Sequence, residues 1–367
     1  MSTPKILLTG ATGFMGGTIL TTLLSSSSTS SSQEIPLPIT CLVRTPEAAA
    51  KLTATYGPSL LHPILFASLD DTSSLTTAAS SHDIVIHTSL SYHTPSALAL
   101  LAGLAQRKRV TGQKVWMIHT SGTSNVADFP VSRKRYVSSD DFVLDDEEDD
   151  VYSFERDREK EWGYGQRATE IAVVEGGLEL GVETVVVMCP TIFGVGTGLF
   201  NRVSIQVPAY IRAGIEHGRV VVVGEGKGVW NYVHVQDMAD LYLLVVGRIV
   251  KRDGEGLPMG KKGILFCENG MFSWMDAARG AAQVLFEEGL VEENKVECVD
   301  RAEGARVLGS LMGFVDEDII EVALSSNART RASVGRRLGW VPTRGEEEWK
   351  KGFKDDLKEI LRTRGGR

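Results

Sequence analysis

A glycine-rich segment near the N-terminus constrains the fold of this chain more than any other feature. Residues 5–8 are predicted to form a buried parallel strand and residues 18–24 an apolar helix, with Gly10, Gly13 and Gly16 between them. The first glycine permits a tight turn, the second lets backbone N–H groups approach a pyrophosphate, and the third lets the helix pack closely on the strand. Because a helix N-terminus also attracts anions, the segment predicts a binding unit for a dinucleotide.

Two motifs resemble those of a known family. The spacing Gly-x-x-Gly-x-x-Gly after Thr9 is similar to that of the extended and atypical short-chain dehydrogenase/reductases, the group that includes the sugar-nucleotide epimerases and dehydratases. Residues 220–240 resemble that family's Gly-x-Gly…Arg-Asp-Phe-Ile-His-Val-x-Asp-Val-Ala pattern. The resemblance covers nearly the whole chain and implies an α/β fold. It implies a doubly wound parallel Rossmann core in residues 1–190 and a smaller C-terminal α/β substrate lobe in residues 191–367, with some segments (about 229–270) returning to the core.

Charge, apolar runs and cysteine spacing exclude several classes of protein. The 367-residue chain carries a net charge of −8, which argues against nucleic acid or an anionic membrane as the main partner. No apolar run is long enough to span a bilayer, and the first predicted strand begins too early for a signal peptide. The four cysteines show no paired metal spacing. We therefore expect a cytoplasmic protein with reduced thiols, no metal and a small-molecule partner.

Two segments of biased composition are predicted to be surface loops. Residues 25–32 are almost all serine and have nothing to bury. Residues 138–150 end in the acidic run 145–150, in which dense like charges repel one another and stay solvated. We expect this acidic segment to be a mobile loop near the entrance of the site.

Residues that follow the predicted strands indicate which dinucleotide is bound. Arg44 ends the strand at 39–43, where an arginine pairs with the 2′-phosphate of NADP(H) and a carboxylate would favour NAD(H); a solvated surface arginine is the alternative. In the resembling family an acidic residue near Asp70 meets the adenine amino group, although Asp70 or Asp71 is equally suited to cap a helix. By resemblance, the remaining cofactor contacts are Gly10, Thr12, Gly13, Phe14, Met15, Gly16, Thr88, Tyr164, Pro190 and Ile192.

The family's catalytic Tyr-x-x-x-Lys pair is incomplete in this chain. Tyrosine and lysine four residues apart lie on one helix face, and the ammonium lowers the tyrosine pKa so that the tyrosine exchanges a proton with the substrate oxygen. In the predicted helix at 162–175, Tyr164 is present but position 168 is alanine. Arg167 stands at i+3 and supplies charge, although arginine keeps its proton. Another alignment places Arg167 at the lysine and loses the tyrosine to Gly163.

Hydroxyl side chains follow the predicted strand at 114–119. In the family, the end of this strand carries the hydroxyl that orients the substrate oxygen. Here Gly122 falls at that position, with Ser121 and Thr123 on either side. These two residues complete the predicted catalytic set with Tyr164 and Arg167, although hydroxyl-rich turns without chemistry are also common.

The resemblance also indicates which residues meet the substrate. Trp230 stands where sugar-nucleotide enzymes commonly carry an arginine for the diphosphate, and a neutral ring cannot pair with two phosphates. A ring there would stack on a planar or apolar substrate. The sequence therefore disfavours nucleotide sugars. The predicted substrate contacts are Ser89, Phe193, Asn201 and Trp230.

These features together favour an NADP(H)-dependent oxidoreductase of the reductase or epimerase type, acting on a small non-nucleotide carbonyl or hydroxyl compound. Tyr164 would be the proton donor, with Ser121 or Thr123 orienting the carbonyl. Because Ala168 replaces the lysine, the alternative is an NADP(H)-binding protein that is redox-inactive, such as a sensor or regulator, or that catalyses a non-redox reaction. The family often forms dimers, so the resemblance also implies a possible homodimer.

Overall fold

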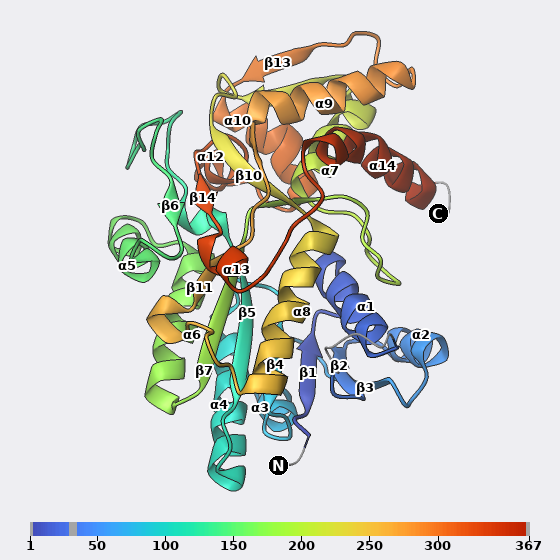
Figure 1. Ribbon diagram of the computed structural model, residues 1–367. Coiled ribbons are helices and arrows are strands. Elements are labelled where there is room, and N and C mark those ends of the chain that lie inside the picture. The colour runs from blue at the N-terminus through green and yellow to red at the C-terminus, as the bar shows by residue number, and fades with distance from the viewer. Residues whose placement is uncertain (1–2, 29–34, 365–367) are drawn as a thin grey trace.

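A parallel sheet forms the centre of the structure (Figure 1). The computed structural model describes residues 3–28 and 35–364. Within them seven strands pair, all parallel, in the order β11-β7-β5-β4-β1-β2-β3. The chain moves outward from β1 in one direction and then in the other, which confirms the predicted doubly wound α/β fold. The strands are β1 (Ile6–Thr9), β2 (Ile39–Val43), β3 (Leu61–Leu65), β4 (Ile84–His87), β5 (Trp116–Gly122), β7 (Glu183–Cys189) and β11 (Ile264–Phe266).

Helices cover both faces of this sheet. On one face lie α3 (Thr72–Ala79), α4 (Thr94–Thr111) and α6 (Gly165–Leu180), and on the other α1 (Phe14–Ser28) and α8 (Val235–Arg252). Along β1, Leu7 belongs to one hydrophobic cluster, whereas Ile6 and Leu8 belong to the other. Because both faces are buried, the strands are continuous apolar runs without polar alternation.

Shorter strands and further helices lie beyond the carboxyl ends of the sheet (Figure 1). β8, β10 and β12 form one small sheet, and β9 pairs with β13 in another. In the second half of the chain, α8 packs on α1 and β11 joins the central sheet. Among the described residues, no helix has both the length and the apolar character needed to cross a membrane. The elements not yet given are α2 (Pro46–Tyr56), η1 (Thr123–Val126), β6 (Leu144–Asp145), α5 (Val151–Glu161), β8 (Thr191–Phe193), α7 (Gln206–His217), β9 (Val220–Val223), β10 (Val229–His234), η2 (Gly260–Lys262), β12 (Met271–Ser273), α9 (Trp274–Glu287), β13 (Val296–Val299), α10 (Arg301–Gly304), η3 (Ala305–Gly309), α11 (Ser310–Met312), α12 (Glu317–Leu324), β14 (Thr330–Arg331), α13 (Ser333–Arg337) and α14 (Glu346–Arg364).

The first two residues of the acidic run, Asp145 and Asp146, are buried and anchored in the fold, which corrects the prediction of a mobile, solvated loop for them; residues 147–150 are exposed, as predicted. Asp145 belongs to β6, which pairs with β14. The buried Asp146 carboxylate accepts hydrogen bonds from the backbone N–H groups of Phe266 (2.8 Å) and Val334 (2.9 Å). The acidic residues can be read from the sequence. The backbone N–H groups that donate to Asp146, however, belong to segments more than a hundred residues away.

The serine-rich segment is also partly helical. The prediction of a loop at 25–32 is wrong for its first four residues, because α1 continues to Ser28. Residues 29–34 lie outside the described residues.

Replacing Asp146 by alanine tests whether the acidic run has a structural role. The variant leaves two buried backbone N–H groups without an acceptor, so the free energy of unfolding should fall by about 2–4 kcal/mol. Glu148→Ala removes an exposed carboxylate two residues further along and should change it by less than about 0.5 kcal/mol. Urea denaturation of both variants measures the difference. Equal stabilities of the two variants would contradict the anchoring role.

Candidate cofactor pocket and active site

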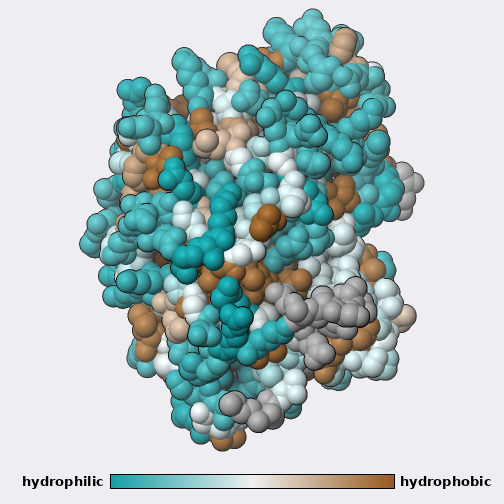
Figure 2. Space-filling model, in the orientation of Figure 1, coloured by the Kyte–Doolittle hydropathy of each residue, from teal (hydrophilic) through white to brown (hydrophobic). Residues whose placement is uncertain are grey.

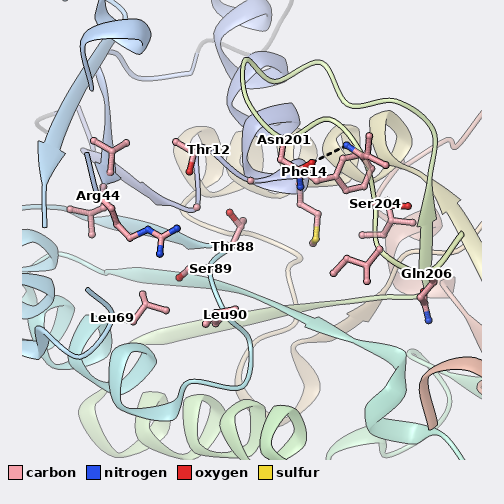
Figure 3. Close-up of a pocket in the computed structure, with 18 of the residues that line it drawn as sticks. Thr12, Phe14, Arg44, Leu69, Thr88, Ser89, Leu90, Asn201, Ser204 and Gln206 are labelled. Carbon is pink, nitrogen blue, oxygen red and sulfur yellow. Dashed lines mark hydrogen bonds between the residues drawn. The ribbon is translucent and has the colours of Figure 1, made fainter. Parts of the chain in front are cut away.

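A cavity of about 510 Å³ opens at the carboxyl ends of β1, β2 and β4 (Figure 3). The strand order reverses between β1 and β4, and ligands of open α/β sheets bind at such a switch point. The cavity is lined by the glycine-rich turn, by the ends of β2 and β4, and by the segment after β7. Its lining residues are Gly10, Thr12, Gly13, Phe14, Met15, Leu42, Val43, Arg44, Phe66, Leu69, Thr88, Ser89, Leu90, Pro190, Ile192, Asn201, Val203, Ser204, Ile205 and Gln206.

The geometry of the glycine-rich turn explains why glycine stands at its first and last positions. Gly10 has φ +73°, and a Cβ on it would lie 2.6 Å from the carbonyl oxygen of Thr88. A Cβ on Gly16 would lie 2.3 Å from the carbonyl oxygen of Gly10. The turn closes through a 2.8 Å hydrogen bond from the Gly13 N–H to the Gly10 carbonyl. The backbone N–H groups at the N-terminus of α1 are therefore not covered by side chains from these positions. Such an uncovered turn at a helix N-terminus can bind a pyrophosphate.

Arg44 lines the cavity at the end of β2, and its guanidinium points into the cavity in Figure 3. Asp70 is not among the lining residues; its exposed carboxylate lies 3.1 Å from His93 Nε2. Its neighbour Asp71 accepts a hydrogen bond from the Ser74 N–H and caps α3, as one of the alternatives predicted. The position of Asp70 therefore does not support its predicted contact with adenine.

A loop after β8, residues 194–205, crosses the first turns of α1; we call it the strap loop. Its Gly198 meets Gly17 of α1 so closely that a Cβ on Gly198 would lie 2.8 Å from the Gly17 Cα. The backbone N–H of Asn201 donates to the carbonyl of Thr12 (3.3 Å). The strap loop therefore packs against the dinucleotide-binding turn.

Tyr164 lies within a small polar cluster. It is the N-cap residue of α6, with φ −127° and ψ 117°, and its hydroxyl donates to Ser124 Oγ at 3.1 Å. Ser124 Oγ in turn donates to Gln166 Oε1 (2.6 Å), and Gln166 Nε2 donates to Ser91 Oγ (2.8 Å). Sequence reasoning missed Ser124, Gln166 and Ser91. Ser124 stands in the same hydroxyl-rich turn as the residues chosen, and only the fold shows which hydroxyl faces the tyrosine.

Arg167 has a structural role, which corrects its predicted place in catalysis. The side chain is 1% exposed, and its Nε pairs with Glu159 Oε2 at 2.9 Å. Its remaining N–H groups donate to backbone carbonyls, including that of Asn125 (2.8 Å), and its guanidinium lies 5.8 Å from the centre of the Tyr164 ring. Because α6 begins only at Gly165, the tyrosine is not part of the helix, and the i+3 relation does not bring the arginine to its hydroxyl.

Ser121 and Thr123 also lie apart from the Tyr164 hydroxyl, which corrects their predicted role. Both are buried, and Ser121 Oγ accepts a hydrogen bond from Asn125 Nδ2 at 3.1 Å. The same Asn125 amide donates to Glu170 Oε2 at 2.7 Å. Ser124, the next residue, is instead the one that meets Tyr164. Ser121 therefore belongs to a buried network with Asn125 and Glu170, whereas the buried Thr123 Oγ1 has no hydrogen-bond partner among the described residues.

Two predicted substrate contacts are core residues. Trp230 is 3% exposed, donates from Nε1 to Ser326 Oγ (2.9 Å) and packs on Trp274. Phe193 is 1% exposed and packs edge-on against Trp349. Both lie on the inward faces of short strands, a feature that family resemblance did not predict. The other two predicted substrate contacts, Ser89 and Asn201, do line the cavity. Thr88, Pro190 and Ile192, predicted to contact the cofactor, line it as well, whereas Tyr164 is not among the lining residues. No group of three or more His, Cys, Asp and Glu side chains within the described residues is arranged to hold a metal ion.

Comparisons with known proteins agree with this geometry. A model of the NAD dependent epimerase/dehydratase family matches residues 6–256. The chain is 30% identical over 354 residues to an Acremonium protein named Oxidase ucsJ, covering 93% of each chain. It is similar in fold to a mutant dTDP-glucose 4,6-dehydratase from Streptomyces venezuelae solved with NAD (TM-score 0.64, 15% identity, 98% of each chain). It is also similar to UDP-glucuronic acid 4-epimerase from Bacillus cereus solved with UDP-glucuronic acid and NAD (TM-score 0.61, 14% identity, 97% of this chain and 99% of that one).

The buried carboxyl groups behind Tyr164 predict how stability depends on pH. Burial raises the pKa of Glu170 to about 7, and it also raises that of the neighbouring Glu155 well above its ordinary value. The folded protein therefore holds protons that the unfolded chain releases. The free energy of unfolding should fall by roughly 2–3 kcal/mol between about pH 5 and about pH 8 because of Glu170 alone.

Glu170→Gln should make this dependence much shallower, because the amide does not ionise. Glu179→Gln, an exposed change on the same helix, should leave the dependence as it is in the wild type. Urea denaturation at the two pH values measures both. A wild-type stability that stays level or rises over this interval would contradict the assignment of a protonated, buried Glu170.

Proposed function

This chain belongs to the NAD dependent epimerase/dehydratase family, and from that premise we propose that it is an NADP(H)-dependent oxidoreductase acting on a small, uncharged carbonyl or hydroxyl compound. The observation that carries the proposal is the cavity at the β1/β4 switch point, which joins a bare glycine-rich turn to an apolar chamber. Both relatives of known structure described above were solved with NAD, which supports a nicotinamide dinucleotide as the cofactor.

The preference for NADP(H) is supported by the charge at the end of β2. Arg44 is the only charged side chain among the described residues that line the cavity. A guanidinium there forms charge-assisted hydrogen bonds with a 2′-phosphate, whereas recognition of an unphosphorylated ribose calls for a carboxylate. We also propose that the protein is cytoplasmic, as expected from the sequence.

The preference for an uncharged substrate is supported by the opposite end of the cavity. Ser204 and Gln206, which lie on the far side of the cavity from Arg44 in Figure 3, are neutral, and the apolar residues Ile192, Val203 and Ile205 line the same cavity. A sugar nucleotide brings two phosphates, which enzymes pair with cations. Because Trp230 is a core residue, the preference for an uncharged substrate now depends on the residues that line the cavity and not on Trp230.

Tyr164 is the proposed proton donor. A bound NADP(H) supplies the hydride donor or acceptor. As the substrate oxygen gains negative charge, the Tyr164 hydroxyl gives it a proton, and water restores that proton afterwards. Burial raises the pKa of Tyr164, so the side chain is protonated at neutral pH and gives up its proton only as negative charge develops on the substrate oxygen. The second candidate, a dinucleotide-binding sensor without redox activity, is favoured by the alanine at position 168.

Tyr164→Phe separates these two functions. Purified protein is mixed with NADPH and a panel of neutral aldehydes and ketones, and with nucleotide-diphosphate sugars for comparison, while NADPH absorbance is followed. We expect turnover of at least one apolar carbonyl, reduced by about 100-fold or more in the variant, with NADPH binding unchanged. Tight NADPH binding without turnover of any compound would support the sensor. Preferred turnover of a nucleotide sugar would contradict the substrate class.

Arg44→Ala tests the choice of cofactor. Loss of a charge-assisted contact should weaken NADPH binding by about 10- to 100-fold and leave NADH binding within about a factor of two. Arg109→Ala, an exposed arginine on α4, is the matched control. Fluorescence titration of both nucleotides measures the four affinities. An equal loss for NADPH and NADH would assign Arg44 to another part of the dinucleotide.

A further inference from the structure

The polar cluster around Tyr164 has an unusual central member. Three segments converge there: the loop after β4 brings Ser91, the turn η1 brings Ser124, and the first turn of α6 brings Gln166. Gln166 uses both ends of its amide, accepting from Ser124 at 2.6 Å and donating to Ser91 at 2.8 Å. Its side chain therefore links all three segments through hydrogen bonds.

The end of β5 leaves room for this amide. A Cβ on Gly122 would lie 3.0 Å from Gln166 Nε2 and 3.3 Å from Oε1. Any larger residue at 122 would push against the amide that joins Ser91 and Ser124. The glycine at the place where the family carries a serine thus belongs to the same arrangement as the glutamine.

The direction of the hydrogen bonds determines what Ser124 offers to the tyrosine. Because the Ser124 proton is donated to Gln166 Oε1, the Ser124 oxygen is left to accept the proton of Tyr164 (3.1 Å). The glutamine also lies at the edge of reach of the phenol, with Oε1 at 3.5 Å from it. The Tyr164 hydroxyl is thereby held in one orientation by neutral groups.

The charged and titratable groups that face Tyr164 do not take over this task. Arg167 uses its guanidinium on Glu159 and on backbone carbonyls, and Glu159 accepts the Tyr164 backbone N–H at 3.1 Å. The Tyr92 phenol belongs to the loop after β4. Burial, the largest effect, raises the pKa of Tyr164. The Ser124 hydroxyl lowers this pKa when it donates to the phenolate, which requires that it give up its hydrogen bond to Gln166; Arg167 also lowers the pKa and Tyr92 raises it.

We propose that Gln166 is the positioning residue for Tyr164: held between Ser91 and Ser124, it fixes the Ser124 oxygen as the acceptor of the Tyr164 hydroxyl and does so without charge. The place of a charged lysine partner is thus taken by an amide–hydroxyl relay built from a different position of the helix. The catalytic meaning of this relay rests on the proposed function, whereas the hydrogen-bond arrangement does not.

The relay predicts an order of tyrosine ionisation in a set of variants. Phenolate formation is followed by ultraviolet difference titration, with Tyr164→Phe subtracted in each background so that one phenol is observed. In the wild type Tyr164 should titrate above the ordinary value of about 10. In Gln166→Met, Ser124 regains a free proton to donate to the phenolate, so Tyr164 should titrate lower. In Gln166→Lys the added ammonium should lower it further, by at least about one unit from the wild type.

Controls separate positioning from folding. Gln113→Met and Gln113→Lys change an exposed glutamine after α4 and should leave the titration unchanged. Thermal unfolding and NADPH affinity of the Gln166 variants should stay close to those of the wild type. If Gln166→Met does not fold, the comparison of Gln166→Lys with the wild type carries the test.

Two results would overturn the proposal: a wild-type Tyr164 that ionises below its ordinary value, or Gln166 variants that titrate like the wild type. With an active carbonyl substrate, Gln166→Met should also lower kcat by about tenfold at unchanged KM. If no substrate is turned over and the titration order still holds, the proposed function fails and the positioning role of Gln166 stands.

Discussion

The close contact between the glycine-rich turn and the end of β4 is the constraint on which the rest of the structure depends. Gly10 and Gly16 permit backbone to lie against backbone beside Thr88, whose hydroxyl also donates to the carbonyl of Thr9 at 2.6 Å. This contact fixes the position of the N-terminus of α1 relative to the sheet. The cavity lies next to it, at the switch point between β1 and β4. The strap loop then packs on α1 through a second glycine contact, between Gly17 and Gly198, and closes the cavity from the other side.

The proposed active site combines a tyrosine at the position that the family resemblance predicts with an electrostatic environment that lacks the family's lysine. Charge near Tyr164 is used for structure, because Arg167 holds the start of α6 to Glu159 and to backbone carbonyls. Within the part of the chain that the structure describes, the hydroxyl forms hydrogen bonds only with neutral partners, Ser124 and, at longer range, Gln166. The cavity itself is lined largely by apolar and neutral polar side chains, with Arg44 as the one charged residue among those described, so its lining away from Arg44 suits substrates that bring no phosphate.

The parts of the fold and site that could be predicted are those that short segments determine. The glycine-rich turn, the arginine after β2 and the residues after β7 follow directly from strand ends, and they do line one cavity. Trp230 and Asp146 were misjudged because their partners, Trp274 and the backbone of α13, come from distant segments. Arg167 was misjudged because the helix predicted at 162–175 begins only at Gly165, three residues later than expected. Ser124 and Gln166 were missed because a hydroxyl-rich turn does not reveal which side chain faces the tyrosine.

The central claim is that the cavity above the glycine-rich turn binds a nicotinamide dinucleotide. Calorimetric titration of the wild-type protein with NADPH tests it most directly, with ATP as a nucleotide that lacks the nicotinamide half. We expect one NADPH site per chain, with a dissociation constant for NADPH in or below the range of about 1–10 μM. ATP should bind much more weakly. Absence of heat with NADPH, NADP⁺, NADH and NAD⁺ on folded protein would contradict it.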